Sequence, residues 1–526
     1  MFFNRKQKQL KQIRNSFGLT KTEGFSLDLI KRYFNRKDHS NAFHVLSEQT
    51  CNDLDLDLFF CYIDRTRSKI GQQFLYNKLR TAHFSFENMH HQEKVISELL
   101  NDPQTRTEIE FLLSKLNNQQ SYYVCDLFQQ ELDAKPRWFI IFPLLSFTAL
   151  LSILLSAFNS NTIFIFALLL PIHVILHYGL KRKTTLFLNA IPSLLSLGSV
   201  AKKLSKINVL KNENSELEEA ISVISKIRRK MSFFKIEQKI DSDMEAAYWF
   251  LLELIKISFL LEPLLLFSSL DKLRNKSLAI EKVFEFIGFV DTCISVASLR
   301  SSEKNFCIPE VNVQFSHAKF RNLRHPLIPD CVPNTLSEEK SILLTGSNMS
   351  GKTTFIRAFG LNYISGMALN TCFAEGAVLP VAKLFSAIRI EDDLMNASSY
   401  FFREISEIKT IIEQSEDSTH SIILLDELFK GTNTRERIAS AKGVLKYLGK
   451  SKNQVLVSTH DIELTQLLDE NYELFFFSES ISNGTIHFDY QLKKGIPNHG
   501  NAIRILELND YPKEIIEEAN AVFNNF

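Results

Sequence analysis

Acidic and basic residues are absent from one long stretch of this sequence. Trp138 to Leu180, 43 residues, contains no Asp, Glu, Lys or Arg. Asn159-Ser160-Asn161 divides the stretch into 21 residues (138–158) and 19 residues (162–180). Each half has about the ~20 residues that a helix needs to cross the core of a bilayer. A buried hairpin in a soluble core is the alternative, but two adjacent charge-free segments of this length favour a transmembrane helical hairpin.

Cations flank the charge-free stretch on both sides. They are Lys135, Arg137, Lys181, Arg182 and Lys183. Because cytoplasmic flanks carry the excess of Lys and Arg, both ends of the hairpin are predicted to be cytoplasmic. We therefore expect residues 135–183 to place the protein in a membrane, with its N- and C-terminal domains on the cytoplasmic side.

A third apolar stretch, 246–270, differs from the first two because it is charged. It carries Glu253, Lys256 and Glu262. Charges at the centre of a membrane helix are costly, so this stretch is predicted to be a core helix.

Paired cysteines and a secretion signal are also lacking. The seven cysteines are scattered, odd in number and include no Cys-x-x-Cys pair, which excludes an obvious zinc site or disulfide framework. The N-terminus has no apolar core of a signal peptide. A reducing cytosolic environment fits these features best.

The net charge of +1 gives no general argument for nucleic acid, so any such surface must be local. The first 40 residues carry ten Lys or Arg against three acids, which makes residues 1–45 a basic N-terminal arm. This arm is suited to phosphates of nucleic acid or of lipid head groups, and a solvated charged terminus is the alternative.

The pattern of apolar residues divides the rest of the chain into two kinds of structure. Residues 46–134 and 184–305 have apolar positions at helical spacing and little glycine, which predicts an all-α core or lever domain interrupted by the hairpin. In residues 306–526, short apolar runs at 342–344, 422–425 and 455–457 alternate with helical patterns. This alternation predicts an α/β domain with a mostly parallel sheet. Residues 474–477 and 486–490 flank Ser482-Asn483-Gly484 and predict an antiparallel hairpin at its edge.

A glycine-rich loop follows the first of these predicted strands and precedes a predicted helix. It comprises Gly346, Ser347, Asn348, Met349, Ser350, Gly351, Lys352, Thr353 and Thr354. Spacing and context are those of a phosphate-binding loop, whose backbone N–H groups and helix N-terminus surround phosphates. Lys352 is expected to reach the β- and γ-phosphates, and Thr353 to ligate Mg²⁺.

Two further strand ends carry candidate catalytic residues. Asp426 and Glu427 end the strand 422–425, where Asp426 is expected to hold the metal and Glu427 to polarise a water. Exposed turn carboxylates are the alternative. His460 ends the strand 455–457 and is a candidate contact to the γ-phosphate, although a lone histidine after a strand is often incidental. These residues predict a P-loop ATPase that uses ATP and Mg²⁺.

Several of these segments resemble the MutS family of DNA mismatch repair ATPases. The resembling segments are Gly346–Thr354, Asp426–Thr434, Ser458–His460 with Glu463-Leu464, Asp392–Leu394, Ser399–Glu404, Arg324–Leu327 and Asn52–Leu79. The resemblance implies a homodimer in which Ser399 of one subunit reaches ATP bound to the other, and it implies DNA as the partner.

The sequence also departs from the family pattern. Only some 45 residues precede the helical core, with no Phe-x-Glu wedge, so the mismatch-reading domain is expected to be absent. Phe429-Lys430 replaces the usual Gly-Arg. The aromatic residue that stacks on adenine in relatives would fall near Cys331-Val332, where there is no ring.

These features predict a membrane-tethered, MutS-like ATPase whose ATP-switched dimer acts on DNA. One alternative is a transporter-type ATPase, which shares the loop and the acidic pair, but the Leu-Ser-Gly-Gly-Gln type signature of that class is missing. The other is a membrane-anchored scaffold in which the ATP switch controls a protein partner.

Overall fold

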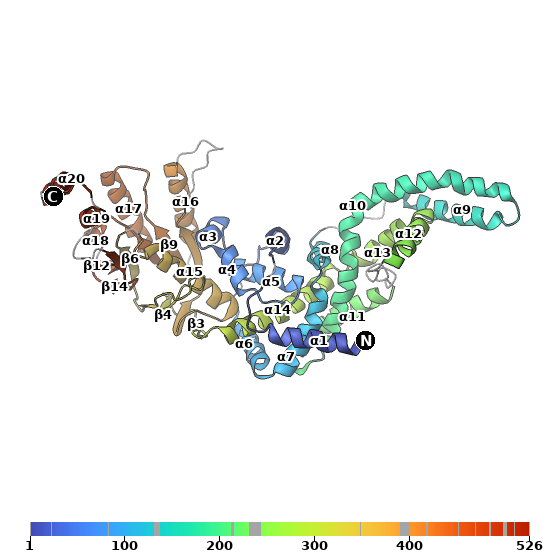
Figure 1. Ribbon diagram of the computed structural model, residues 1–526, viewed down its shortest axis with the longest axis horizontal. Coiled ribbons are helices and arrows are strands. Elements are labelled where there is room, and N and C mark those ends of the chain that lie inside the picture. The colour runs from blue at the N-terminus through green and yellow to red at the C-terminus, as the bar shows by residue number, and fades with distance from the viewer. Residues whose placement is uncertain are drawn as a thin grey trace. The chain divides into compact units, whose positions relative to one another are not determined.

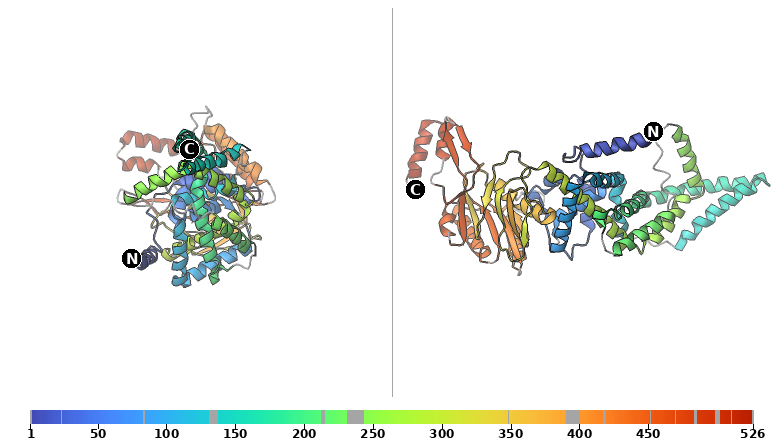
Figure 2. Two further views of the ribbon diagram at one scale, coloured as in Figure 1. Left: turned by 90° about the vertical axis from the view of Figure 1, so that its right-hand side faces the viewer. Right: turned by 90° about the horizontal axis from the view of Figure 1, so that it is seen from below.

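The computed structural model forms two units (Figures 1 and 2). It describes residues 2–22, 24–82, 84–130, 137–211, 215–230, 243–347, 349–389, 400–416, 419–450, 452–468, 470–482, 485–497, 502–509 and 511–524. Unit 1 comprises Met1–Asp38, Asp64–Asn77 and Lys94–Ser298, and unit 2 comprises His39–Ile63, Lys78–Glu93 and Leu299–Phe526. The predicted domain boundaries follow the sequence order, whereas these units each combine three segments.

Unit 1 is helical in its described part, as predicted. Its helices are α1 (Phe2–Asn15), α2 (Leu27–Arg36), α7 (Pro103–Leu113), α8 (Asp126–Gln129), α9 (Ile141–Leu155), α10 (Ile163–Leu204), α11 (Ser215–Lys230), α12 (Asp243–Ser258) and α13 (Leu261–Leu273). The unit boundaries fall within or beside α5 (Lys69–Arg80), α6 (Phe86–Asn101) and α14 (Ser277–Ser302). On α14 the buried Asp291 accepts hydrogen bonds from the backbone N–H groups of Arg67 and Ser68, both 2.7 Å long. Gly71 packs against the same carboxylate, because a Cβ there would lie 2.1 Å from Asp291 Oδ2.

The two charge-free segments form helices that lie side by side (Figure 1). Helix α9 ends at Leu155, and α10 continues past the predicted end at residue 180 as far as Leu204. Two segments are long and apolar enough to cross a membrane, Trp138–Leu155 and Ser160–Gly179, and only 22% and 11% of them is buried. A helix of a soluble core would be mostly buried, so the exposure of these helices disagrees with the buried-hairpin alternative.

The prediction of one core helix over 246–270 was wrong. The chain forms two helices, α12 and α13, separated at Phe259-Leu260. On α12, apolar side chains are exposed, with Phe250 at 67% and Leu251 at 53%, whereas Glu253 and Lys256 are each only 7% exposed. These ionisable groups can be buried here because Lys256 pairs with Glu253 and Glu262, which the sequence pattern alone did not show.

Unit 2 is built around a six-stranded sheet with the strand order β14-β11-β6-β10-β9-β8. The strands are β6 (Ser341–Thr345), β8 (Ala382–Ala387), β9 (His420–Asp426), β10 (Gln454–Ser458), β11 (Tyr472–Phe476) and β14 (Lys493–Lys494). All pairs are parallel except β11 with β14. The three strands predicted from apolar runs are therefore adjacent at the centre of a mostly parallel sheet. Parallel order brings their carboxyl ends to one edge.

Helices cover both faces of this sheet. On one face, α16 (Tyr400–Ser415) and α17 (Thr434–Leu448) pack on Leu343, Ile423 and Val455. On the other face, α15 (Lys352–Leu369) packs so closely that a Cβ on Gly360 would lie 2.8 Å from Leu424 Cδ1. Successive strand residues point to opposite faces, which explains why the strands are apolar without alternation.

The remaining strands of unit 2 form smaller sheets. A four-stranded sheet has the order β3-β7-β4-β5, built from β3 (Glu310–Asn312), β4 (Lys319–Leu323), β5 (Asn334–Leu336) and β7 (Gly376–Pro380). Two-stranded sheets join β1 (His44–Val45) to β2 (Thr81–Ala82) and β12 (Glu479–Ser482) to β13 (Thr485–Phe488). The predicted hairpin turn is confirmed by the β12–β13 pair. The predicted pairing of 474–477 in this hairpin was wrong, because residues 474–476 lie in β11, parallel to β6, and β13 pairs with β12 instead.

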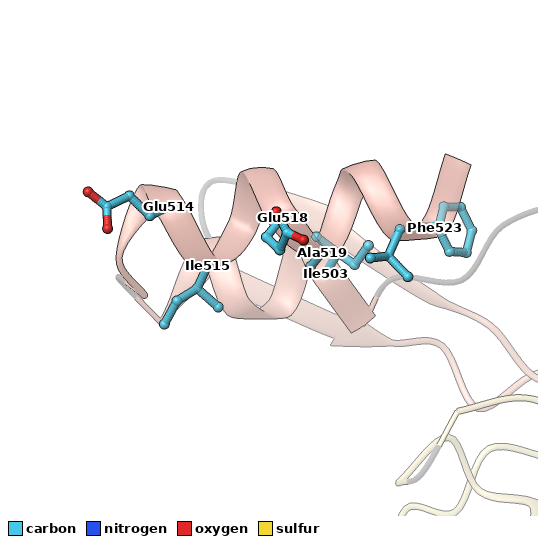
Figure 3. A pocket seen from close by; sticks show the side chains of 7 residues that line it. Ile503, Glu514, Ile515, Glu518, Ala519 and Phe523 are labelled. Atoms are coloured by element: carbon cyan, nitrogen blue, oxygen red, sulfur yellow. The ribbon is translucent and has the colours of Figure 1, made fainter. Parts of the chain in front are cut away.

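The other α-helices in the described part of unit 2 include α3 (Glu48–Asp53), α4 (Leu56–Ile63), α18 (Glu463–Leu467), α19 (Ala502–Leu508) and α20 (Lys513–Asn524). Between α19 and α20 an open groove of about 830 Å³ is lined by Ile503, Ile515, Ala519, Val522 and Phe523, with Glu514 and Glu518 at its side (Figure 3). Phe523 is 62% exposed, so this groove presents apolar surface.

Candidate functional site at the carboxyl edge of the sheet

The glycine-rich loop lies between β6 and α15, as predicted. Gly346 and Gly351 have φ angles of 141° and 109°, a region that favours glycine. A Cβ on Gly346 would also lie 2.5 Å from the carbonyl oxygen of Phe477. Helix α15 begins at Lys352, so its free N–H groups face the loop and create positive potential there.

Lys352 is folded over the loop and is only 4% exposed. Its Nζ donates to the carbonyl oxygens of Gly346 and Ser347, at 2.7 and 2.9 Å. Burial lowers the pKa of Lys352, opposed by the nearby carboxylates of Glu427 and Asp426. The buried Ser350 hydroxyl has no hydrogen-bond partner among the described residues. A buried ammonium and an unsatisfied hydroxyl on one loop are suited to an anionic ligand.

Asp426 lies at the end of β9, where neighbouring elements supply hydroxyl groups. Thr353 Oγ1 donates to Asp426 Oδ2 at 2.8 Å, and Ser458 Oγ donates to Asp426 Oδ1. The two residues predicted to ligate Mg²⁺, Thr353 and Asp426, are therefore in direct contact. Ser458 was missed by the sequence analysis, although its position at the end of β10, in register with Asp426, points to this contact.

Glu427 follows directly and has a φ of 52°, an uncommon value for a residue with a side chain. Its Oε1 contacts His460 Nε2, and its Oε2 lies 2.6 Å from Lys430 Nζ. Burial would raise the pKa of Glu427, but His460 and Lys430 outweigh it and lower the pKa to about 2. His460 Nδ1 also lies 3.3 Å from the Gly346 carbonyl oxygen, so one histidine joins the acidic residue to the loop.

A cavity of about 540 Å³ adjoins the loop. Its lining includes Glu427 and seven residues of the loop: Ser347, Met349, Ser350, Gly351, Lys352, Thr353 and Thr354. Cys331, Val332 and Tyr490 also line it. This size is within the range of small-molecule and cofactor sites.

Tyr490 supplies an aromatic ring that the sequence analysis missed. A Cβ on Gly351 would lie 3.3 Å from Tyr490 Cδ1, and the Tyr490 ring stacks on Phe488 with centroids 5.9 Å apart. The Asn334 amide donates to the Tyr490 carbonyl oxygen at 3.0 Å. The sequence has no ring near Cys331-Val332, because Tyr490 comes from far along the chain, just after β13. The sequence signal was the aromatic pair Phe488 and Tyr490, at and just after the end of β13.

Helix α3 and the segment after it contact the sheet next to the site. The buried Asp53 carboxylate accepts hydrogen bonds from Ser386 Oγ (2.6 Å) and from the N–H groups of Ile388 and Arg389. Asp55 pairs with Arg389 at 2.7 Å and with Arg357 of α15 at 3.5 Å. Asp55, in the resembling segment 52–79, therefore contacts the helix that carries Lys352.

Two predicted binding residues, Asn348 and Ser399, lie outside the described residues, as do Asp392–Leu394. The other predicted residues converge within one edge of unit 2: Gly346, Ser347, Met349, Ser350, Gly351, Lys352, Thr353, Thr354, Asp426, Glu427 and His460.

Comparison with known proteins gives a consistent result. Residues 342–526 match the family model of MutS domain V. The chain is 30% identical over 309 residues to the DNA mismatch repair protein MutS of Oceanobacillus iheyensis, covering 56% of this chain and 35% of that protein. It is 34% identical over 259 residues to the protein of the same name from Petrotoga mobilis, covering 47% of this chain and 31% of that protein.

The chain thus spans about a third of the length of these relatives. The matched region contains the loop, the acidic pair and the histidine whose contacts are described above. The domain V match and these relatives support membership of the MutS family.

Proposed function

We propose that this protein is an ATPase that binds ATP with Mg²⁺ in the 540 Å³ cavity and hydrolyses it. The main support for this proposal is that five side chains from three strand ends meet beside this cavity. They are Lys352, Thr353, Asp426, Glu427 and His460. An apolar parallel sheet that presents a buried ammonium, a hydroxyl and two carboxylates at one edge suits a metal–triphosphate ligand.

Each residue has a role that its contacts support. Lys352 and the N-terminus of α15 bind phosphate oxygens, and the unsatisfied Ser350 hydroxyl becomes paired there. Thr353 and Asp426 would hold Mg²⁺. When bound, Mg²⁺ neutralises phosphate charge and ATP supplies the phosphoryl group that water attacks.

Glu427 orients that water. A carboxylate with a pKa of about 2 is ionised at neutral pH but is a weak proton acceptor. While Glu427 contacts Lys430 and His460, we therefore expect it to position the attacking water rather than to remove a proton from it. Weakening of either contact raises the pKa of Glu427 and makes it a better base, which would couple hydrolysis to the position of His460.

Tyr490 provides the surface on which the base of the nucleotide stacks. Its ring lines the cavity together with Cys331 and Val332, on the side of Gly351. Stacking accepts any base, so we expect weak discrimination between ATP and GTP.

We further propose a homodimer that acts on DNA. The relatives are named DNA mismatch repair proteins, and Ser399 is proposed to complete the ATP site of the partner subunit. The apolar groove between α19 and α20 is surface that a second copy would bury. On α1, Lys6, Lys8, Lys11 and Arg14 are exposed, which supports a phosphate-binding surface.

We also propose that α9 and the first half of α10 lie in a membrane. Their exposed side chains include Phe164 at 71%, Leu168 at 74% and Ile175 at 71%. Lipid would cover this surface, with the N- and C-terminal domains in the cytoplasm. The prediction is that the full chain resists alkaline extraction from membranes. Release of the wild-type chain by alkali would contradict the membrane proposal and leave the ATP site untouched.

The functional test is steady-state ATP hydrolysis by the detergent-purified full chain, with and without duplex DNA, over a range of salt concentrations. Stimulation by DNA that weakens steeply with salt supports action on DNA. Hydrolysis without any DNA effect supports the scaffold alternative. Mixing Ser399→Ala chains with Lys352→Ala chains tests the dimer, because one composite site in a mixed pair retains both residues. No recovered activity at any ratio would contradict a shared site.

A further inference from the structure

Helices α10, α12 and α13 surround a polar cluster that has no part in the ATP site. It comprises His177, Glu253, Lys256 and Glu262, with exposed side-chain fractions of 0%, 9%, 8% and 15%. The same three helices lie side by side in unit 1 (Figure 1). Apolar side chains on the outside of α12 and α10, among them Phe250 and Ile175, are exposed. The cluster is therefore enclosed by apolar helices, where unpaired charge is costly.

The two carboxylates are each shared between a lysine and a histidine. Lys256 Nζ lies 3.4 Å from Glu253 Oε2 and 3.3 Å from Glu262 Oε1. The other oxygen of each carboxylate, Glu253 Oε1 and Glu262 Oε2, lies 3.5 Å from His177 Nε2. The ammonium thus occupies one side of the acidic pair, and an imidazole nitrogen faces the other side.

His177 is the unexplained member of this cluster. Its side chain is buried, yet neither Nδ1 nor Nε2 has a hydrogen-bond partner among the described residues. Its neighbour one turn earlier, His173, is equally buried but its Nδ1 pairs with the Ser258 carbonyl oxygen at 2.8 Å. A buried imidazole normally satisfies at least one nitrogen, so Nε2 of His177 is aimed at a position that a ligand would fill.

The separations suit ligands of one metal ion. His177, Glu253 and Glu262 each offer an atom, and these atoms lie within 4.8 Å of one another. Two ligands at about 2.1 Å from a tetrahedral ion are separated by roughly 3.4 Å, close to the 3.5 Å from His177 Nε2 to each carboxylate oxygen. We propose that His177 Nε2, Glu253 Oε1 and Glu262 Oε2 bind a divalent transition metal ion of the Zn²⁺ class.

Charge and ligand type support this class of ion. With a neutral imidazole, two carboxylates and one ammonium leave the enclosed cluster with a net charge of −1. A divalent ion changes this to +1, and a hydroxide in the fourth position makes the cluster neutral. Mg²⁺ and Ca²⁺ prefer oxygen ligands only, whereas one nitrogen and two oxygens suit Zn²⁺, Mn²⁺ or Co²⁺. Lys256 then acts as an outer partner that keeps the carboxylates in place.

The test is metal retention by the purified full chain in detergent. The chain is loaded with Zn²⁺, dialysed against metal-free buffer and analysed for bound zinc. We expect one equivalent per chain, and Co²⁺ in place of Zn²⁺ to give the visible spectrum of a bound nitrogen–oxygen site. His177→Gln and Glu253→Gln should weaken binding by more than the ~10–100-fold that loss of an outer-shell partner causes.

His173→Gln is the matched control, because it alters an equally buried histidine on the same helix that is not a ligand. It should retain the metal, as should Lys352→Ala. If the wild type retains no zinc, or if His177→Gln retains as much as the wild type, the site does not exist. If a ligand variant fails to fold, the Co²⁺ spectrum of the wild type decides, since a spectrum of the hydrated ion alone would overturn the proposal.

Discussion

The sheet of unit 2 and the helices α9, α10, α12 and α13 of unit 1 distribute apolar and ionisable side chains in opposite ways. In the sheet, Leu343, Ile423 and Val455 are fully buried, and the carboxylates lie at strand ends beside a cavity. In the helices, Leu168 and Phe250 are exposed, while ionisable groups are buried among them.

This difference agrees with the proposal that water surrounds the sheet and lipid surrounds the exposed helices of unit 1. Burial of apolar surface stabilises the sheet because water surrounds it. When lipid surrounds a helix, leucine side chains on its outer surface are favourable because they contact apolar lipid tails. Ionisable groups are then favoured on the inside, where they pair with one another. Four predictions test this comparison, in order of decreasing expected effect.

The largest effect is expected at the polar edge of the sheet. Glu427→Gln removes the charge that orients water but keeps the shape, so kcat should fall by roughly 10²–10⁴-fold. Steady-state hydrolysis measures this loss, and ATP binding and membrane association should be unchanged. Near-normal turnover would remove Glu427 from the reaction.

Matched leucine truncations test the two kinds of burial directly. Leu424→Ala leaves a cavity between β9 and α15 and should cost about 2–5 kcal/mol of the free energy of unfolding of unit 2. Leu168, 74% exposed, contacts little protein, so Leu168→Ala should change stability by no more than about 0.5 kcal/mol. Denaturant unfolding in detergent measures both. Equal costs would mean that the helix is buried against protein after all.

Acid should destabilise unit 2 through two buried histidines. Burial lowers the pKa of both His44 and His325 to about 4, against about 6.5 in an unfolded chain. Because the unfolded state binds the proton first, stability is complete above pH 6.5. It falls as the pH drops from 6.5 to 4, by at most about 1.4 kcal/mol per pH unit for each histidine.

The measurement is the unfolding midpoint of unit 2 against pH. His325→Gln should flatten the curve in this window, whereas His90→Gln, at an exposed position, should leave it unchanged. An unaltered slope in His325→Gln would contradict the assignment.

The smallest effect is expected at the rim of the cavity. Tyr490→Ala removes the stacking surface and should raise the Kd for ATP by about tenfold, corresponding to the ~1–3 kcal/mol of one base–aromatic stack. Tyr490→Phe keeps the ring and is the control. An unchanged Kd in Tyr490→Ala would place the base elsewhere.

Local sequence patterns predicted the parts of the fold and site that depend on neighbouring residues. The apolar runs before Gly346, Asp426 and His460 placed these residues at strand ends, and parallel order brought them together. The contact of Ser458 with Asp426 depends on pairing between distant strands, and the position of Tyr490 beside Gly351 depends on the tertiary fold. Spacing along the chain reveals neither. Strand pairing also explains why residues 474–476 lie in the main sheet, between β6 and β14.

The helices of unit 1 also depend on contacts between distant segments, which local sequence patterns do not predict. Glu253, Lys256 and Glu262 indicated a soluble core because each charge was considered alone. In the structure these three residues contact one another and His177, and the four residues come from three helices. The contacts pair charges that a single helix would have to expose. The two hairpin helices were predictable because the absence of charge over 43 residues is itself a local pattern.

Equilibrium binding of ATP with Mg²⁺ to the purified full chain, compared with Lys352→Ala, tests the central claim most directly. The account predicts one bound nucleotide per wild-type chain and strongly reduced binding by the variant, with the zinc content of both proteins equal. Absence of ATP binding by folded wild-type protein, or equal binding by the variant, would contradict it.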